Sequence, residues 1–184
     1  MRLNIHIIIH PIIQKLTYKI IYQKSSKNPE NIDNEKILGM LILYEILRKW
    51  LKINNIYIKK FNVLQEKYFT NHLNKYLIIS NIIENYNILS YIDKILPKNN
   101  LTHVDYDKKI NLYNCKKELQ EHKIIIFEKY IKNYKMIKMI KYLNENNKIK
   151  LANIIIVCLT CSNKVLNYIA QKYPKLNIYT TKII

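Results

Sequence analysis

The chain has 184 residues and a formal net charge of +18, and 49% of its residues are hydrophobic. This apolar content excludes general disorder, and the length allows one domain with a sizeable core. A charge of this size normally indicates nucleic acid or an anionic membrane surface as the partner. The excess is almost entirely lysine, however, because Arg2 and Arg48 are the only arginines. Lysine, isoleucine, asparagine and tyrosine share A/T-rich codons, so an A/T-rich genome such as an organelle's explains the charge without a polyanionic ligand.

The cysteines give no sign of a secreted protein. Cys115, Cys158 and Cys161 cannot build a disulfide framework, which favours a reducing compartment. Cys158 and Cys161 have CxxC spacing, but no second pair or histidine partner completes a zinc site. The pair also begins inside an apolar segment, so we expect buried structural thiols and no metal.

No apolar segment is long enough to cross a membrane. The longest, residues 37–47, contains Glu45 and falls short of the about 20 residues that a span needs. His10 and Pro11 interrupt the N-terminus too early for a secretory signal. We therefore expect a protein without a membrane partner that works in the compartment where it is made.

Apolar periodicity and breaker residues predict strands that alternate with helices. In the first half we expect helices at residues 12–22 and from an Asn34 cap to about Leu51, a short strand at Ile56–Phe61, a buried strand at Tyr76–Ile79 and a helix ending at Leu96. In the second half we expect a strand at Thr102–Tyr106, an irregular segment at 107–122, strands at Ile124–Phe127, Ile154–Leu159 and Leu176–Thr180, and helices after the first two of these strands. The pattern predicts an α/β fold, a mostly parallel open sheet with helices on both faces. Ile124–Phe127 and Ile154–Leu159 should be neighbours in it.

Gly39, the only glycine, lies far from any expected strand end. In open α/β sheets a substrate phosphate sits at the strand ends, where a glycine turn lets backbone N–H groups approach it. The turn after Ile124–Phe127 runs from Glu128 to Met136 and contains no glycine. The architecture is therefore expected without its phosphate cradle.

Four collinear segments resemble the uracil phosphoribosyltransferase family. They are His10-Pro11-Ile12-Ile13, the helix Leu43–Leu51 with its Tyr44-Glu45 pair, Ile92–Pro97, and Tyr173–Ile183. The resemblance runs from His10 to the C-terminus and implies a single phosphoribosyltransferase-like domain. The family joins uracil to the ribose of phosphoribosyl pyrophosphate (PRPP), giving UMP and diphosphate in pyrimidine salvage, with Mg²⁺ bound to PRPP.

The positions that the resemblance assigns to PRPP have changed. Glu128 keeps the acid of the family's Asp-Pro-Met-Leu-Ala-Thr-Gly-Gly-Ser/Thr loop. Lys129 replaces the proline of this loop, Asn133 the threonine, Tyr134 and Lys135 the two glycines, and Met136 the final hydroxyl residue. Ile83 stands at the position of the family's pyrophosphate-binding arginine, and acidic Glu84 follows it. The Gly-rich segment that reads uracil would follow Ile184 and is expected to be missing. Side chains of Tyr134, Lys135 and Ile83 should partly fill the crevice at the strand ends.

Simpler roles compete for each candidate residue. Glu128 is also explained as a helix N-terminal acid, and Lys129, Lys132 and Lys135 as a solvated helix face. His103, near Asp105 and Asp107, fits a polar strand end better than a metal or acid–base site.

Two functions remain open. One is a degenerate, catalytically inactive family member, expected in the plastid stroma, without a tightly bound cofactor and associated with a second copy or an active homologue. The other is a nucleic-acid-binding protein on the same fold, for which lysines clustered on one face would argue.

Overall fold

Six parallel strands form the central sheet. The computed structural model describes residues 3–22, 29–51, 53–61, 63–70, 75–96, 99–108 and 119–184. In spatial order the strands are β1 (Asn4–Ile7), β8 (Asn177–Ile183), β7 (Ile154–Cys161), β6 (Lys123–Ile131), β4 (Tyr76–Ser80) and β5 (Asn99–His103), and every neighbouring pair is parallel. The expected mostly parallel α/β sheet is confirmed, and so is the pairing of Ile124–Phe127 with Ile154–Leu159.

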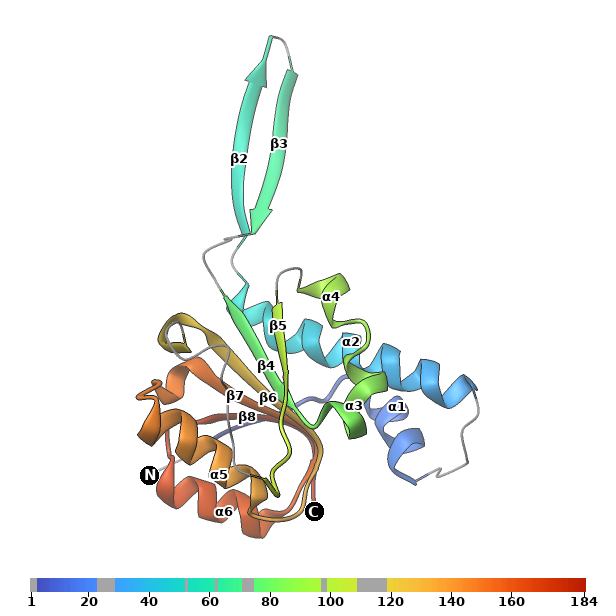
Figure 1. Ribbon diagram of the computed structural model, residues 1–184. Helices are drawn as coiled ribbons and strands as arrows, with labels where there is room; N and C mark the ends of the chain where they lie inside the picture. The colour runs from blue at the N-terminus through green and yellow to red at the C-terminus, as the bar shows by residue number, and fades with distance from the viewer. Residues whose placement is uncertain are drawn as a thin grey trace.

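Helices cover both faces of this sheet (Figure 1). On one face lie α1 (Pro11–Tyr22), α2 (Pro29–Trp50), α3 (Ile82–Leu89) and α4 (Ile92–Ile95), and on the other lie α5 (Lys135–Lys141) and α6 (Asn163–Lys172). Turns of 3-10 helix occupy Leu119–Glu121 and Leu151–Asn153, and a π-helical turn, Tyr142–Asn146, extends α5. The central strands β4 and β7 are buried along their whole length, which explains their continuous Ile, Leu and Val runs. Among the described residues, no helix has the length and apolar character needed to cross a bilayer.

Gly39 lies where α2 crosses α3. A Cβ atom built at this position would stand 1.9 Å from the backbone oxygen of Ile88 and 2.8 Å from its carbonyl carbon. The glycine thus allows two helix backbones to touch and has no part in a phosphate loop, in keeping with its expected distance from the strand ends.

A two-stranded antiparallel hairpin projects from the body (Figure 1). It consists of β2 (Ile53–Lys60) and β3 (Val63–Thr70), paired from Lys60 with Val63 to Ile53 with Thr70. Sequence reasoning expected a short strand here and missed its partner. Phe61, at the tip, is 99% exposed and has a positive φ of 45°.

Several boundaries differ from expectation. α2 starts at Pro29 and not at an Asn34 cap, because proline suits the first turn of a helix and Glu30 follows it favourably. The helix expected to end at Leu96 is divided into α3 and α4 at Ser90, whose hydroxyl donates to the Asn87 carbonyl. β5 lies at Asn99–His103 instead of Thr102–Tyr106, and β1 was not expected. An irregular segment was expected at residues 107–122. Residues 109–118 of this segment, which include Cys115, lie outside the described residues.

Candidate functional site

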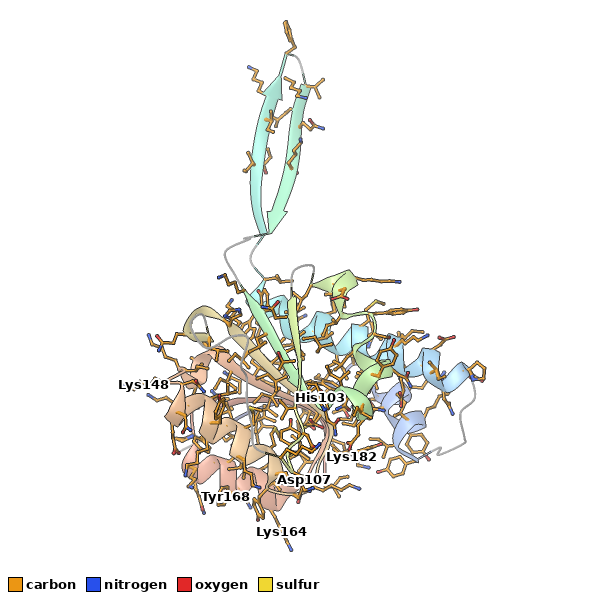
Figure 2. All side chains as sticks on the ribbon, in the orientation of Figure 1. His103, Asp107, Lys148, Lys164, Tyr168 and Lys182 are labelled. Atoms are coloured by element: carbon orange, nitrogen blue, oxygen red, sulfur yellow. The ribbon has the colours of Figure 1, made fainter. Side chains whose placement is uncertain are left out.

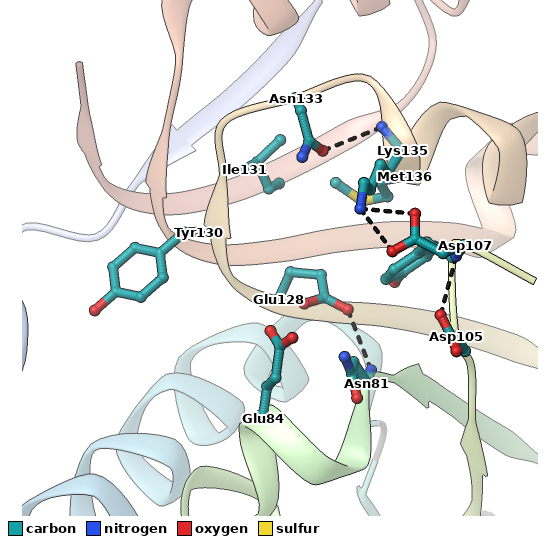
Figure 3. A pocket seen from close by; sticks show the side chains of 11 residues that line it. Asn81, Glu84, Asp105, Asp107, Glu128, Tyr130, Ile131, Asn133, Lys135 and Met136 are labelled. Atoms are coloured by element: carbon teal, nitrogen blue, oxygen red, sulfur yellow. Dashed lines mark hydrogen bonds and ion pairs between the residues drawn. The ribbon is translucent and has the colours of Figure 1, made fainter.

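A small cavity of about 170 Å³ opens at the carboxyl ends of β4, β5 and β6 (Figure 3). This is the edge where open parallel sheets bind ligands. Its lining combines the turn after β4, the residues after β5 and the segment from β6 into α5: Asn81, Glu84, Asp105, Tyr106, Asp107, Glu128, Tyr130, Ile131, Asn133, Lys135 and Met136. The site expected from the sequence therefore lies beside a real cavity.

Glu128 lies within β6, because this strand continues to Ile131 before the chain turns into α5. The competing role of a helix N-terminal acid is therefore wrong. Its Oε1 accepts the Asn81 N–H at 3.2 Å, and its Oε2 accepts the Asn85 Nδ2–H at 3.3 Å. Burial raises the pKa of this carboxyl above its ordinary value of 4.5, although the neighbouring Tyr106 hydroxyl and the hydrogen bonds from Asn81 and Asn85 oppose the rise.

Tyr106 stays protonated beside Glu128. Burial raises the pKa of its hydroxyl, and the Glu128 charge adds to this rise. Two buried groups that both resist ionisation thus form the floor of the cavity.

Acidic side chains dominate the rest of the lining. Glu84, Asp105 and Asp107 join Glu128, whereas Lys135 is the one basic residue among the described lining residues. The Lys135 ammonium lies 2.7 Å from the Asp107 carboxylate, and this hydrogen bond raises its pKa. Its backbone N–H donates to Asn133 Oδ1 at 3.2 Å. The backbone N–H of Lys135 is therefore engaged within the chain, and its ammonium charge is shared with Asp107.

Lys129 and Lys132 do not form the expected lysine face of a helix, because both precede α5. Lys129, in β6, donates to Glu35 of α2 at 2.9 Å, and each of these side chains is only 17% exposed. The Lys132 ammonium lies over the Tyr130 ring, 5.3 Å from its centroid. Lys129 is thus held by an ion pair that links β6 to α2.

The expected filling of the crevice is correct for Lys135 and wrong for the two other residues. Ile83 is 83% exposed in the first turn of α3, so it points to solvent. The Tyr134 ring meets the Tyr168 ring of α6 edge-on, with centroids 5.2 Å apart. Met136, in the first turn of α5, is buried in the core that this helix forms with the sheet. Neither Ile83 nor Tyr134 closes the cavity, because Ile83 faces solvent and Tyr134 packs against Tyr168.

His103, the remaining polar candidate, and the nearby Lys108 have structural partners. His103 accepts the Ile82 N–H on Nδ1 at 3.1 Å, and Lys108 pairs with Asp105 at 3.5 Å. In the part of the chain that the structure describes, no three His, Cys, Asp or Glu side chains form a group able to hold a metal ion. Cys158 and Cys161 are free and buried, as expected of structural thiols.

Comparison with known proteins decides the family. No protein-family model matches the chain. Two curated proteins, each called "Uracil phosphoribosyltransferase homolog", are 30% identical over 186 aligned residues, covering 100% of this chain and 89% of theirs. They come from the red algae Porphyra purpurea and Pyropia yezoensis. The chain belongs to the uracil phosphoribosyltransferase family.

A solved structure supports the fold of this family member. The AQ2163 protein from Aquifex aeolicus superposes with a TM-score of 0.73 at 14% sequence identity, covering 97% of this chain and 86% of that one. The overlap extends to nearly the whole chain, so the two proteins share the same fold along its length.

The state of Glu128 predicts a stabilising substitution. Because its pKa is raised, the folded protein binds more protons than the unfolded chain between the ordinary and the raised value, so stability falls as pH rises through that window. Glu128→Gln keeps an acceptor for Asn81 and removes the buried charge, and the Asn85 amide that loses its acceptor still donates to Ser80 and to the Asn81 carbonyl. We expect a gain on the order of 1 kcal/mol in unfolding free energy at pH 7.

Thermal denaturation at pH 4.5 and pH 7 checks this. The exposed carboxylate of the same cavity supplies the control, since Glu84→Gln should change stability by less than about 0.5 kcal/mol. A Glu128→Gln protein that is less stable than the parent at pH 7 would show that the ionised carboxylate is needed for the fold.

Proposed function

We propose that the protein is a catalytically inactive member of its family, which keeps the fold and has lost PRPP binding. The observation that carries this proposal is the charge of the cavity at the strand ends. Among the lining residues that the structure describes, four are acidic and one is basic, and that lysine is already paired with Asp107. PRPP is highly anionic, so such a lining repels it even where Glu128 is protonated.

The backbone around the cavity supports the same proposal. A phosphate cradle needs several free N–H groups that converge on one point. Here the Lys135 N–H is bonded to Asn133, and the Ile137 N–H donates to the Tyr134 carbonyl at 3.0 Å. The family's glycines match Tyr134 and Lys135, whose side chains need space that a phosphate would occupy. Without bound PRPP, we propose no specific site for its Mg²⁺.

Calorimetric titration with PRPP and Mg²⁺ tests this proposal, with an active uracil phosphoribosyltransferase as the reference. We expect no saturable heat up to millimolar PRPP for this protein. A saturating isotherm with a dissociation constant below about 1 mM would contradict it, because affinity of that size requires about 4 kcal/mol of favourable interaction.

The distribution of lysines favours an enzyme homologue over a nucleic-acid-binding protein. Lysines of α2, α4, β6, α6 and β8 lie over aromatic rings, and Lys148 and Lys164 lie at separate places on the body in Figure 2. A nucleic-acid binder typically gathers its cations on one face. The high content of amino acids with A/T-rich codons and the red-algal relatives support synthesis from a plastid genome and a place in the stroma.

Association with another subunit is part of this proposal. The hairpin presents Tyr57, Phe61, Val63 and Leu64 to solvent, and a two-stranded hairpin alone is only marginally stable in water. A second copy or an active homologue would cover these side chains. Sedimentation of the protein alone and mixed with an active relative distinguishes the two partners, and a monomer in both runs would oppose association.

A further inference from the structure

The outer edge of β1 offers a place for another strand. β1 pairs with β8 on one side, and among the described residues no strand pairs with its other side. Asn4, Ile5 and Ile7 are all exposed. An exposed strand edge is a template for pairing with a further chain.

The register shows which backbone groups face outward. The Ile8 N–H donates to the Thr180 carbonyl of β8 at 2.9 Å. Since backbone groups alternate between the two sides of a strand, the N–H and C=O groups of Ile5 and Ile7 point away from β8. An added strand would find two donors and two acceptors in the spacing of a β-ladder.

The side chains of the same two residues form an apolar face along this edge. Ile5 is 37% exposed and Ile7 is 49% exposed, and both lie in register with Ile178 and Thr180 of β8. Alternate residues of an added strand would pack against these isoleucines.

The opposite face of the edge is basic. A groove of about 560 Å³ runs between β1 and α2, and its lining combines the segment from Ile5 to His10 with Glu45, Arg48, Lys49 and Tyr179. His6 stacks on Tyr179 at 4.5 Å, and the Lys49 ammonium lies 5.9 Å from the same ring. Arg48 contacts Glu45 at 3.6 Å, yet remains mostly exposed. The groove thus presents two full cations against one carboxylate.

We propose that the β1 edge binds an extended segment of another protein in which aliphatic and acidic residues alternate. The two faces of the edge set this pattern, because successive side chains of a strand point to opposite faces. The aliphatic residues pack on Ile5 and Ile7, and the acidic residues reach Arg48 and Lys49. The backbone of the segment extends the sheet beyond β1.

A second copy of this chain fits the edge less well. Its own β1 supplies isoleucines for the apolar face, but it brings Asn4 and His6 to the basic face, and neither of them neutralises Arg48 or Lys49. Charge complementarity therefore selects an acidic partner strand.

Fluorescence anisotropy with labelled peptides tests the proposal. The probe is an acetylated peptide of alternating glutamate and valine, compared with one in which lysine replaces glutamate. We expect the acidic peptide to bind at least tenfold more tightly, and its affinity to fall as salt increases. The double variant Arg48→Glu/Lys49→Glu should lose at least tenfold in affinity. The control Lys60→Glu, on the distant hairpin, should stay within twofold (Figure 1).

A second variant tests the backbone contact. Ile5→Pro removes an outward N–H while the bonds of β1 to β8 remain, and edge strands tolerate such a proline. We expect an unchanged circular dichroism spectrum and loss of peptide binding. Equal affinity for both peptides, or full affinity in the Arg48→Glu/Lys49→Glu protein, would overturn the proposal. So would a dimer of the parent protein that Ile5→Pro converts to monomer, because a second copy would then occupy the edge.

Discussion

Replacing Gly39 by alanine is expected to lower the free energy of unfolding by about 3 kcal/mol, near the upper end of overpacking effects. The added Cβ would stand 1.9 Å from the Ile88 backbone oxygen. A side chain could rotate out of the way, but a helix backbone cannot, so α2 and α3 would have to separate. Leu38 and Ile42, fully buried beside Gly39, would then lose contacts in the core. The better helix propensity of alanine, about 1 kcal/mol, offsets only part of this cost.

Urea denaturation monitored by circular dichroism measures the effect of Gly39→Ala. Tyr44→Ala, at an exposed position of the same helix, is the matched control and should change stability by less than about 1 kcal/mol. We expect the Gly39→Ala midpoint to move clearly to lower urea with a similar slope. An alanine protein as stable as the parent would mean that the two helices separate at little cost.

The sequence predicted the order of most elements because hydrophobic period and breaker residues are local signals. Tyr76–Ile79, Ile124–Phe127 and Ile154–Leu159 are runs of buried apolar residues, and all three are strands of the sheet. No local signal of this kind sets the end of β6. Tyr130 and Ile131 continue the strand because Thr160 and Cys161 of β7 lie opposite them. Pairing with a neighbour thus moved the loop away from the position that the motif comparison assigned.

The charge of the cavity was even less accessible to sequence reasoning. In the sequence, Glu84 stands beside the lost arginine, and Asp107 is one of several polar residues after an expected strand. The fold places both around the same cavity, where Asp107 pairs with Lys135 across 28 positions of sequence. Likewise, Lys129 is held by Glu35, 94 positions away. Such pairs have no periodic pattern, so the sequence showed their members without showing their partners.

No formation of UMP is expected from uracil and PRPP by the isolated protein, with or without Mg²⁺. Phosphoribosyl transfer passes through an oxocarbenium-like state while diphosphate departs with its negative charge, so the enzyme contributes positioning and electrostatic stabilisation. The loop position for the 5′-phosphate has side chains in place of glycines, and the position for the pyrophosphate arginine is Ile83, which points to solvent. Losing one such charge-assisted contact typically costs on the order of 2–4 kcal/mol, or roughly 30- to 1,000-fold in rate.

Two lost contacts need not add fully, but the remaining groups do not replace them. Glu128 neutralises no phosphate charge, and its raised pKa reflects burial in a site that disfavours a second anion. Lys129 and Lys135 are already paired with carboxylates, so they could attract PRPP only weakly. Attraction without orientation lowers the barrier of the reaction little. A radiolabelled uracil assay measures UMP directly, with a reaction lacking protein as the baseline and an active family member as the positive control. UMP above that baseline, abolished by Glu128→Gln but retained by Lys164→Gln, would show that the cavity is still a catalytic site, because Lys164 lies on α6 and lines no part of it.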